Sequence, residues 1–261
     1  MDLNLKGKSA LVSGSTQGIG KAIATELANL GASVTLLARN KEKLEEVRND
    51  LFHGSGQNHK TLVADFAKPN ELKSVIDEHI KQNQYHILIN NTGGPPGGQA
   101  IDADLEAFRI AFNQHLICNQ ILAQATTPFM KEQGYGRIIN VISTSVKAPL
   151  QGLGVSNTVR GAVGNWSKTL ANELGQFGIT VNNVLPGATA TQRLSSIIEN
   201  KANKLGKSVE EVEEKMKADI PAKRFASADE VAAAAAFLAS PAASYINGIN
   251  VPVDGGRTPS L

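Results

Sequence analysis

Three glycines near the N-terminus have the spacing of a turn that binds an anion. Gly14, Gly18 and Gly20 follow an apolar run and precede a segment of helical pattern, Lys21 to Leu30. Glycine permits a tight turn, brings the backbone close to a phosphate and allows a helix to pack closely on a sheet, while the first N–H groups of the helix face the anion. The spacing G-x-x-x-G-x-G therefore predicts a strand-to-helix turn that holds the pyrophosphate of a dinucleotide, and an ordinary turn between a strand and a helix is the alternative. The residues predicted to contact the dinucleotide here are Gly14, Ser15, Thr16, Gln17, Gly18, Ile19 and Gly20.

Arg39, which follows the second apolar run, bears on the choice of dinucleotide. An acidic residue at this place would bind the ribose hydroxyls of NAD, whereas an arginine can pair with the 2′-phosphate of NADP. We therefore expect NADP(H) to be favoured over NAD(H). The alternatives are that Arg39 caps a loop or stacks on adenine.

Polar and small residues also follow the third and fourth apolar runs. Asp65 and Phe66 come after the third, where a carboxylate can accept a hydrogen bond from the adenine amino group. The small-residue turn with Asn91, Thr92 and Gly93 comes after the fourth, where it would admit the adenosine ribose. We expect all five residues to contact the cofactor.

Seven short runs rich in Val, Ile and Leu alternate with helical segments along the chain. This pattern is typical of parallel strands that are covered by helices on both faces. We predict a single α/β domain over residues 1–261, with a doubly wound, parallel, seven-stranded sheet. Ligands of such sheets bind beyond the carboxyl ends of the strands, so the residues after each run are the candidates for a site. The expected strands are Ser9 to Val12, Ser33 to Ala38, Lys60 to Val63, His86 to Ile89, Arg137 to Ile142, Thr180 to Leu185 and Asn250 to Val253.

Residues 192–222 form a polar, charge-rich stretch that is too long for a simple connection. Two helical patterns and no strand pattern occur in it. We predict a helical insertion that acts as a lid over a substrate, with a solvated helical hairpin as the alternative.

The composition excludes several classes of function. The 26 basic and 24 acidic residues are interleaved, so no basic stripe for nucleic acid or anionic lipid is expected. A single cysteine, Cys118, and five scattered histidines show no metal-ligand spacing. The chain has no signal-peptide pattern and no apolar run long enough to span a bilayer. We therefore expect a cytoplasmic protein with a small-molecule substrate and without a metal, a nucleic-acid partner or a membrane anchor.

Five motifs along nearly the whole chain resemble those of the short-chain dehydrogenases/reductases, and of their β-ketoacyl-acyl-carrier-protein reductase-like group. The resemblance implies a Rossmann-like sheet, a nicotinamide dinucleotide, hydride transfer between a carbonyl and an alcohol, and a homotetramer. It also implies cofactor contacts at Pro186, Gly187, Thr189 and Thr191. The motifs are Ser13 to Gly20 for TGxxxGIG, Asn90 to Gly93 for NNAG, Gly136 to Asn140 leading into Ser143, Pro186-Gly187 with Thr191 for PGxxxT, and Asn247 to Gly256 near the end.

The catalytic set departs from this family's usual Asn-Ser-Tyr-Lys. Ser143 stands at the serine position, but Ser156 occupies the tyrosine position and Arg160 the lysine position. His115 aligns with the asparagine, with one residue of slippage that leaves Asn113 or Asn119 as substitutes. The resemblance therefore implies the catalytic candidates His115, Ser143, Ser156 and Arg160.

These replacements change the proton chemistry of the site. Ser156 is a poor general acid, because the hydroxyl of serine is far less acidic than the phenol of tyrosine. Arg160 stays protonated and cannot relay a proton, but its guanidinium can still bond the hydroxyls of a ribose. His115, with an ordinary pKa near ~6.5, is the expected replacement acid. The alternatives are a space-filling histidine at 115 and a proton donated by Lys147.

Two classes of function follow from these residues. The first is an NADP(H)-dependent oxidoreductase that interconverts a carbonyl and a secondary alcohol, 3-oxoacyl reductase-like, with an atypical proton donor. The second is a catalytically impaired dinucleotide-binding sensor or structural subunit, and a lyase or epimerase that uses a bound dinucleotide is a third possibility. For the homotetramer, we expect pairing through the helix near Asp104 and the helix that carries Ser156, with Ala162, Val163 and Trp166 as apolar contacts.

Overall fold

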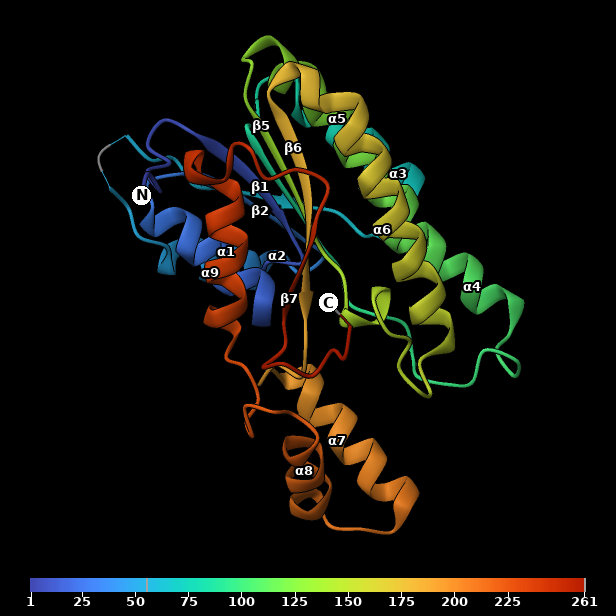
Figure 1. Ribbon diagram of the computed structural model, residues 1–261. Helices are drawn as coiled ribbons and strands as arrows, with labels where there is room; N and C mark the ends of the chain where they lie inside the picture. The colour runs from blue at the N-terminus through green and yellow to red at the C-terminus, as the bar shows by residue number, and fades with distance from the viewer. Residues whose placement is uncertain (55, 261) are drawn as a thin grey trace.

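A computed structural model describes residues 1–54 and 56–260 as one α/β domain built on a single sheet (Figure 1). All seven strands are parallel, in the order β3-β2-β1-β4-β5-β6-β7. From β1 the chain adds β2 and β3 on one side and then crosses to add β4 to β7 on the other, so the strand order reverses between β1 and β4, where ligands bind in doubly wound sheets. The predicted sheet is confirmed. The strands are β1 (Ser9–Ser13), β2 (Ser33–Ala38), β3 (Lys60–Val63), β4 (Ile87–Asn91), β5 (Gly136–Val141), β6 (Ile179–Pro186) and β7 (Asn250–Val253).

Side chains that alternate along each strand build two separate hydrophobic cores. In β1, Val12 enters one core and Leu11 the other, because successive side chains point to opposite faces of a sheet. Val34 and Leu37 of β2 divide in the same way. Both faces are buried, and this explains why the strands are apolar along nearly their whole length.

Helices cover both faces of the sheet (Figure 1). One core is closed by α1, α2 and α9, and the other by α3, α5 and α6, with α4 packed on α6. A short π-helix, Asn113–Ile117, joins α4 to α5. The main helices are α1 (Gly18–Asn29), α2 (Lys41–Asp50), α3 (Pro69–His79), α4 (Leu105–Phe112), α5 (Cys118–Glu132), α6 (Gly154–Leu174) and α9 (Ala228–Ala239), and 3₁₀ turns lie at Thr144–Val146, Gly175–Phe177 and Pro241–Ala243.

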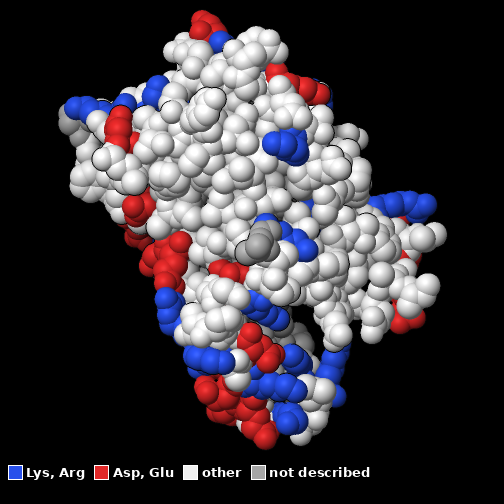
Figure 2. Space-filling view, in the orientation of Figure 1, with Lys and Arg blue, Asp and Glu red and all other residues white. Residues whose placement is uncertain are grey.

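Two further helices, α7 (Gln192–Leu205) and α8 (Val209–Ala218), project beyond the carboxyl ends of the strands (Figure 1). They form the two helices expected within residues 192–222. Charged side chains of both signs gather over this projection, whereas the rest of the face in Figure 2 carries few. Its own small core is built from Leu194, Ile198, Ala202 and Val212. This hairpin is therefore a unit packed separately from the two cores of the sheet.

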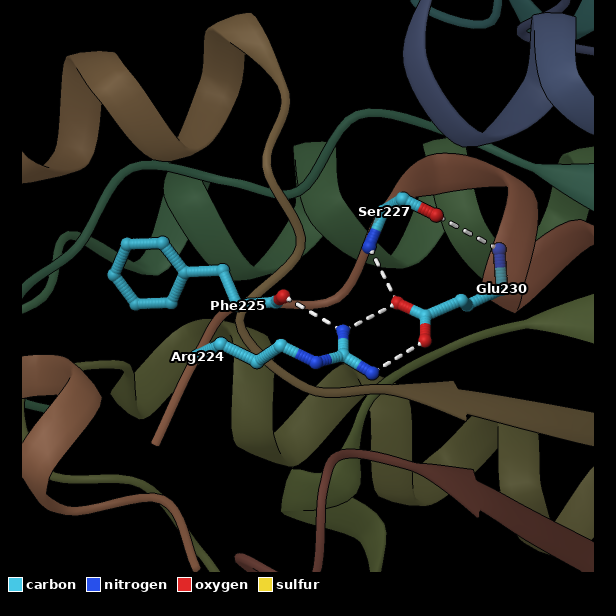
Figure 3. A network of polar contacts seen from close by, with 4 residues as sticks. All are labelled: Arg224, Phe225, Ser227 and Glu230. Atoms are coloured by element: carbon cyan, nitrogen blue, oxygen red, sulfur yellow. Dashed lines mark hydrogen bonds and ion pairs between the residues drawn. The ribbon is translucent and has the colours of Figure 1, made fainter. Parts of the chain in front are cut away.

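The base of the α7–α8 hairpin is tied to the body of the protein at both ends. At its start, Ala190 N–H donates to the carbonyl of Ala226 (2.8 Å), which lies after α8. Next to it, both outer nitrogens of Arg224 donate to the Glu230 carboxylate at 2.7 and 2.6 Å (Figure 3). The same carboxylate accepts from Ser227 N–H, and Ser227 in turn caps α9 (Figure 3).

Some element boundaries differ from the sequence-based expectation. The first helix begins at Gly18 rather than Lys21, so Gly18 to Gly20 form its first turn. Strand β4 continues through Asn91, where a turn was expected, because Asn91 still pairs with Val141 of β5. In the described part of the chain, no helix is long and apolar enough to cross a membrane.

Candidate functional site

The glycine turn between β1 and α1 adopts a backbone that other residues would disturb. Gly14 and Gly18 have φ angles of +60° and +53°, in the left-handed region. A Cβ on Gly14 would lie 2.4 Å from the carbonyl oxygen of Asn91, and one on Gly20 would lie 2.1 Å from the carbonyl oxygen of Gly14. The side chain of Asn91 holds the turn by donating to the carbonyls of Ser13 (3.3 Å) and Gly14 (3.2 Å). Asn91 thus braces the turn.

The start of α1 suits an anion. Gln17 precedes the helix in an extended conformation, and no side chain of the described residues caps it. The first N–H groups of a helix need an acceptor, and an anion is the strongest one. Thr191 lies beside this turn, since a Cβ on Gly18 would be 3.3 Å from its Cγ2. The turn therefore fits the pyrophosphate of a dinucleotide.

The remaining predicted cofactor contacts lie at the same edge of the sheet. Ser15 is fully buried, and its hydroxyl donates to the Leu37 carbonyl, so its side chain does not face a ligand in this structure. Arg39 is exposed at the end of β2. Asp65 is half-buried beyond β3 and accepts from Ala67 N–H at 2.9 Å. The others are Ile19 in the first turn of α1, and Thr16, Phe66 and Gly93 in the segments that follow β1, β3 and β4.

The turn after β6 is shaped by close backbone contacts. Pro186 ends the strand, and a Cβ on Gly187 would lie 2.7 Å from the Cα of Asp254. Thr189 is buried, and its hydroxyl donates to the carbonyl of Gly187 (3.2 Å). Its backbone carbonyl accepts from the hydroxyl of Thr191 (3.3 Å). Thr189 therefore stabilises the turn that places Thr191 beside the glycine turn.

The two candidate serines lie on neighbouring elements at this edge. Ser143 follows β5, and its Oγ accepts from Ser145 N–H (3.1 Å) at the start of a 3₁₀ turn. Ser156 is in the first turn of α6, one helical turn before Arg160. Both serines are half-buried, so part of each side chain is accessible.

His115 is buried in the π-helix, with 2% of its surface exposed. Its Nδ1 shares a hydrogen bond with Thr92 Oγ1 (2.5 Å), and its Nε2 has no partner among the described residues. Burial, followed by the charges of Arg160 and Arg193, lowers the pKa of His115 to about 3. This lowered pKa argues against the expectation that His115 titrates near neutral pH, and favours a neutral imidazole.

Arg160 crosses from α6 to the carboxyl ends of two strands. Its Nη1 donates to the carbonyl of Val141 (2.9 Å), which ends β5, and its Nη2 to that of Thr92 (3.4 Å), just after β4. The side chain is 7% exposed, and its Nε is buried without a partner. Burial, with Arg193 nearby, lowers the pKa of Arg160 to about 10, so the guanidinium stays charged at neutral pH.

Arg193 is a site residue that the sequence did not single out. It lies in the first turn of α7, and its Nη2 donates to the carbonyl of Pro95 in the loop after β4 (3.3 Å). A Cβ on Gly94 would be 2.9 Å from Arg193 Nη2 and 3.6 Å from Arg160 Nη2. The only signal in the sequence is its place two residues after Thr191.

The three tyrosines lie away from this edge. Tyr85 precedes β4, is buried and donates to Thr35 Oγ1 (2.9 Å), and burial raises its pKa to about 12. Tyr135 precedes β5 and donates to the carbonyl of Ala239 (2.9 Å). Tyr245 lies fully exposed before β7. The described structure therefore offers no tyrosine as the proton donor.

A ladder of asparagine side chains crosses the sheet just behind the site. Asn90 donates to Asn140 Oδ1 (2.8 Å), Asn140 to Asn183 Oδ1 (3.0 Å), and Asn183 to Asn250 Oδ1 (2.8 Å). These residues are paired in register on β4, β5, β6 and β7. The ladder fixes the strand ends that carry Thr92 and Val141.

Comparison with known proteins agrees with this geometry. A family model described as "Enoyl-(Acyl carrier protein) reductase" matches residues 14–258. The NADPH-dependent reductase BacG of Bacillus subtilis is 32% identical over 256 residues, which cover 97% of this chain and 99% of that protein. The chain belongs to the short-chain dehydrogenase/reductase family.

Other proteins of this short-chain dehydrogenase/reductase family have similar sequences or structures. The 2-dehydro-3-deoxy-D-gluconate 5-dehydrogenase of Bacillus subtilis is 33% identical over 97% of this chain and 95% of its own length. The crystal structure of L-sorbose reductase from Gluconobacter frateurii, complexed with NADPH and L-sorbose, matches with a TM-score of 0.92 at 30% identity, covering 100% of both chains. The family resemblance seen in the motifs is confirmed.

The surface expected to join subunits needs one correction. Val163 is fully buried against Ile142 and Leu185, because it is on the side of α6 that packs on the sheet. Ala162 instead lines a hollow of about 450 Å³ between α4 and α6, together with Phe108 and other residues. Exposed apolar side chains near it are Leu105, Ile110 and Phe112 of α4.

Proposed function

We propose that this protein is an NADP(H)-dependent reductase that interconverts a ketone of 3-oxoacyl type and a secondary alcohol, with an atypical proton source. The observation that carries the proposal is Arg160, a buried cation that spans the ends of β4 and β5 where the family has a lysine. The 3-oxoacyl class rests on the motif resemblance alone. NADP(H) is supported by the exposed Arg39 after β2 and by two relatives, one named an NADPH-dependent reductase and one solved with NADPH.

Bound NADPH would supply the hydride, and the chain's own residues would manage the charge that the hydride creates. The hydroxyls of Ser143 and Ser156 donate hydrogen bonds to the substrate oxygen from β5 and α6. The permanent charge of Arg160 stabilises the negative charge that develops on that oxygen. The proton then comes from water, since none of these groups is an acid at neutral pH.

In this proposal His115 positions other groups and does not transfer the proton. Its neutral ring bonds to the hydroxyl of Thr92. The backbone carbonyl of the same Thr92 accepts from Arg160. The His115–Thr92 pair therefore holds the end of β4 against the guanidinium. A π-helix at this place agrees with the frequent occurrence of such turns at functional sites.

We further propose that α7 and α8 form a lid, that the enzyme is a homotetramer and that it is cytoplasmic. The separate core of the hairpin and its tie at Ala226 support a lid that moves as a unit. The hollow between α4 and α6 and the exposed Phe112 support an interface there. The free thiol of Cys118 is buried and suits a reducing compartment.

NADPH consumption at 340 nm, with a panel of ketones, tests the function. We expect turnover with NADPH, weaker turnover with NADH, and a fall of about 100- to 1,000-fold in kcat for Ser143→Ala. Arg39→Ala should reduce the preference for NADPH over NADH. Tight NADPH binding without turnover of any ketone would refute the enzyme and favour a sensor, and activity that appears only in the Ser156→Tyr/Arg160→Lys variant would show that the chain has lost its acid.

A further inference from the structure

Two arginine side chains, Arg160 and Arg193, meet beside Gly94, and among residues 1–54 and 56–260 no acidic side chain bonds to either. The position of a Cβ on Gly94 lies within 3.6 Å of the Nη2 atoms of both Arg160 and Arg193. Within the described residues, the hydrogen bonds of both guanidiniums go to backbone carbonyls, which are neutral. In the described part of the chain, the ion pairs involve neither of them.

Holding these two cations together is unfavourable unless an anion joins them. Arg160 is more than nine-tenths buried, and one of its nitrogens, Nε, is buried without a partner. A buried cation without a counter-charge is costly, and a second cation nearby adds repulsion. The arrangement is therefore complete only with a negatively charged ligand.

The position of the pair favours the substrate as the source of this anion. The glycine turn and the start of α1 already provide a site for the cofactor pyrophosphate. The arginine pair lies instead where the loop after β4, the first turn of α7 and α6 come together. On α6, Ser156 is one helical turn before Arg160. A substrate whose carbonyl bonds to Ser156 would therefore lie near this pair.

We propose that Arg193 and Arg160 bind a carboxylate of the substrate, so that the substrate is an oxo acid. This inference rests on the proposed function, because it names the substrate class of the same site. A guanidinium offers paired N–H groups that match the two oxygens of a carboxylate. Arg193 is exposed and is the direct ligand, and Arg160 contributes the buried charge behind it.

Binding of the carboxylate would also favour closure of the lid formed by α7 and α8. Arg193 is in the first turn of α7, and Pro95, whose carbonyl it contacts, is in the loop after β4. An anion held between Arg193 and Arg160 connects the hairpin to α6. The acid would thus be enclosed more firmly than a neutral ketone of the same shape.

Matched pairs of substrates test the inference. Acetoacetate and longer 2- and 3-oxo acids are compared with their neutral ethyl esters, using wild type, Arg193→Gln and Arg193→Lys. We expect wild type to prefer the acids, and Arg193→Gln to raise KM for the acids by about 10- to 100-fold with little change for the esters. Lysine should restore part of the loss. Lys201→Gln, which removes an exposed cation from the same helix, is the control and should match wild type.

Equal use of acids and esters by wild type, or equal losses for both in Arg193→Gln, would overturn the proposal. A weaker affinity for NADPH in Arg193→Gln, with unchanged discrimination between acid and ester, would assign Arg193 to a cofactor phosphate and overturn it as well.

Calorimetric titration of the protein with the oxo acids, alone and with NADP⁺, needs no turnover. Arg193-dependent binding of acids without reduction of any ketone would refute the proposed function but support the carboxylate site. Absence of acid binding under both conditions would refute the carboxylate site itself.

Discussion

Replacing Asn140 with leucine should weaken the asparagine ladder without changing the fold. Asn140 is fully buried and makes three side-chain hydrogen bonds, to Asn90, Ser167 and Asn183. Leucine has the same number and branching of side-chain heavy atoms, but it leaves the Asn90 donor and the Ser167 and Asn183 acceptors without these partners. Each orphaned buried group costs about 1–3 kcal/mol, and the added apolar burial offsets about 1–2 kcal/mol of the total. With three groups orphaned, the net loss in unfolding free energy should be about 1–8 kcal/mol.

Urea denaturation measures this loss, with the fluorescence of Trp166, the only tryptophan, as the signal. The midpoint should fall and the slope should stay the same, because the surface exposed on unfolding is unchanged. Asn172→Leu, at an exposed position of α6, is the control and should change stability by no more than about 0.5 kcal/mol. A loss below about 1 kcal/mol for Asn140→Leu would show that the ladder does not hold the strand ends together.

Four further predictions concern the glycine turn, the histidine, the lid and the assembly. Gly18→Val should weaken NADPH binding about 100-fold or more in calorimetry while the protein stays folded, because a branched side chain strains a φ of +53° and occupies phosphate space; a folded variant with normal affinity would exclude the turn as the phosphate site. Because folding lowers the pKa of His115 from 6.5 to about 3, His115 contributes stability above pH 6.5 that is lost as the pH falls toward 3. His115→Asn should therefore make the unfolding free energy fall less steeply between pH 6.5 and 4, by up to about 1.4 kcal/mol per pH unit. An unchanged slope of unfolding free energy against pH would contradict the lowered pKa. Glu230→Gln should speed hydrogen exchange in residues 188–226 but not in the sheet, because the forked bond from Arg224 is lost, and uniform exchange would show that this bond does not anchor the lid. Wild type should sediment as a tetramer and Phe112→Glu as a smaller species, whereas a monomeric wild type would contradict the interface.

Local patterns in the sequence were enough to predict the sheet and the glycine turn. The apolar runs specify buried parallel strands because both faces of each strand must be covered, and the structure has a strand at every predicted run. Gly14 and Gly18 indicate a turn because few other residues adopt a positive φ, which both have. The divergence at Ser156 and Arg160 stays a prediction, which rests on motif spacing along the chain.

Only the tertiary structure decided the electrostatics of the site. Arg193 and Pro95 are 98 residues apart in sequence, and only the packing of α7 against the loop after β4 brings them together. The pKa of His115 depends on burial and on two arginines from other helices, so it departs from the ordinary value on which the sequence-based expectation rests. Helical spacing alone likewise did not show that Val163 faces the sheet. A pattern along the chain specifies which elements form, whereas charge, burial and contact depend on distances between elements that the sequence does not list.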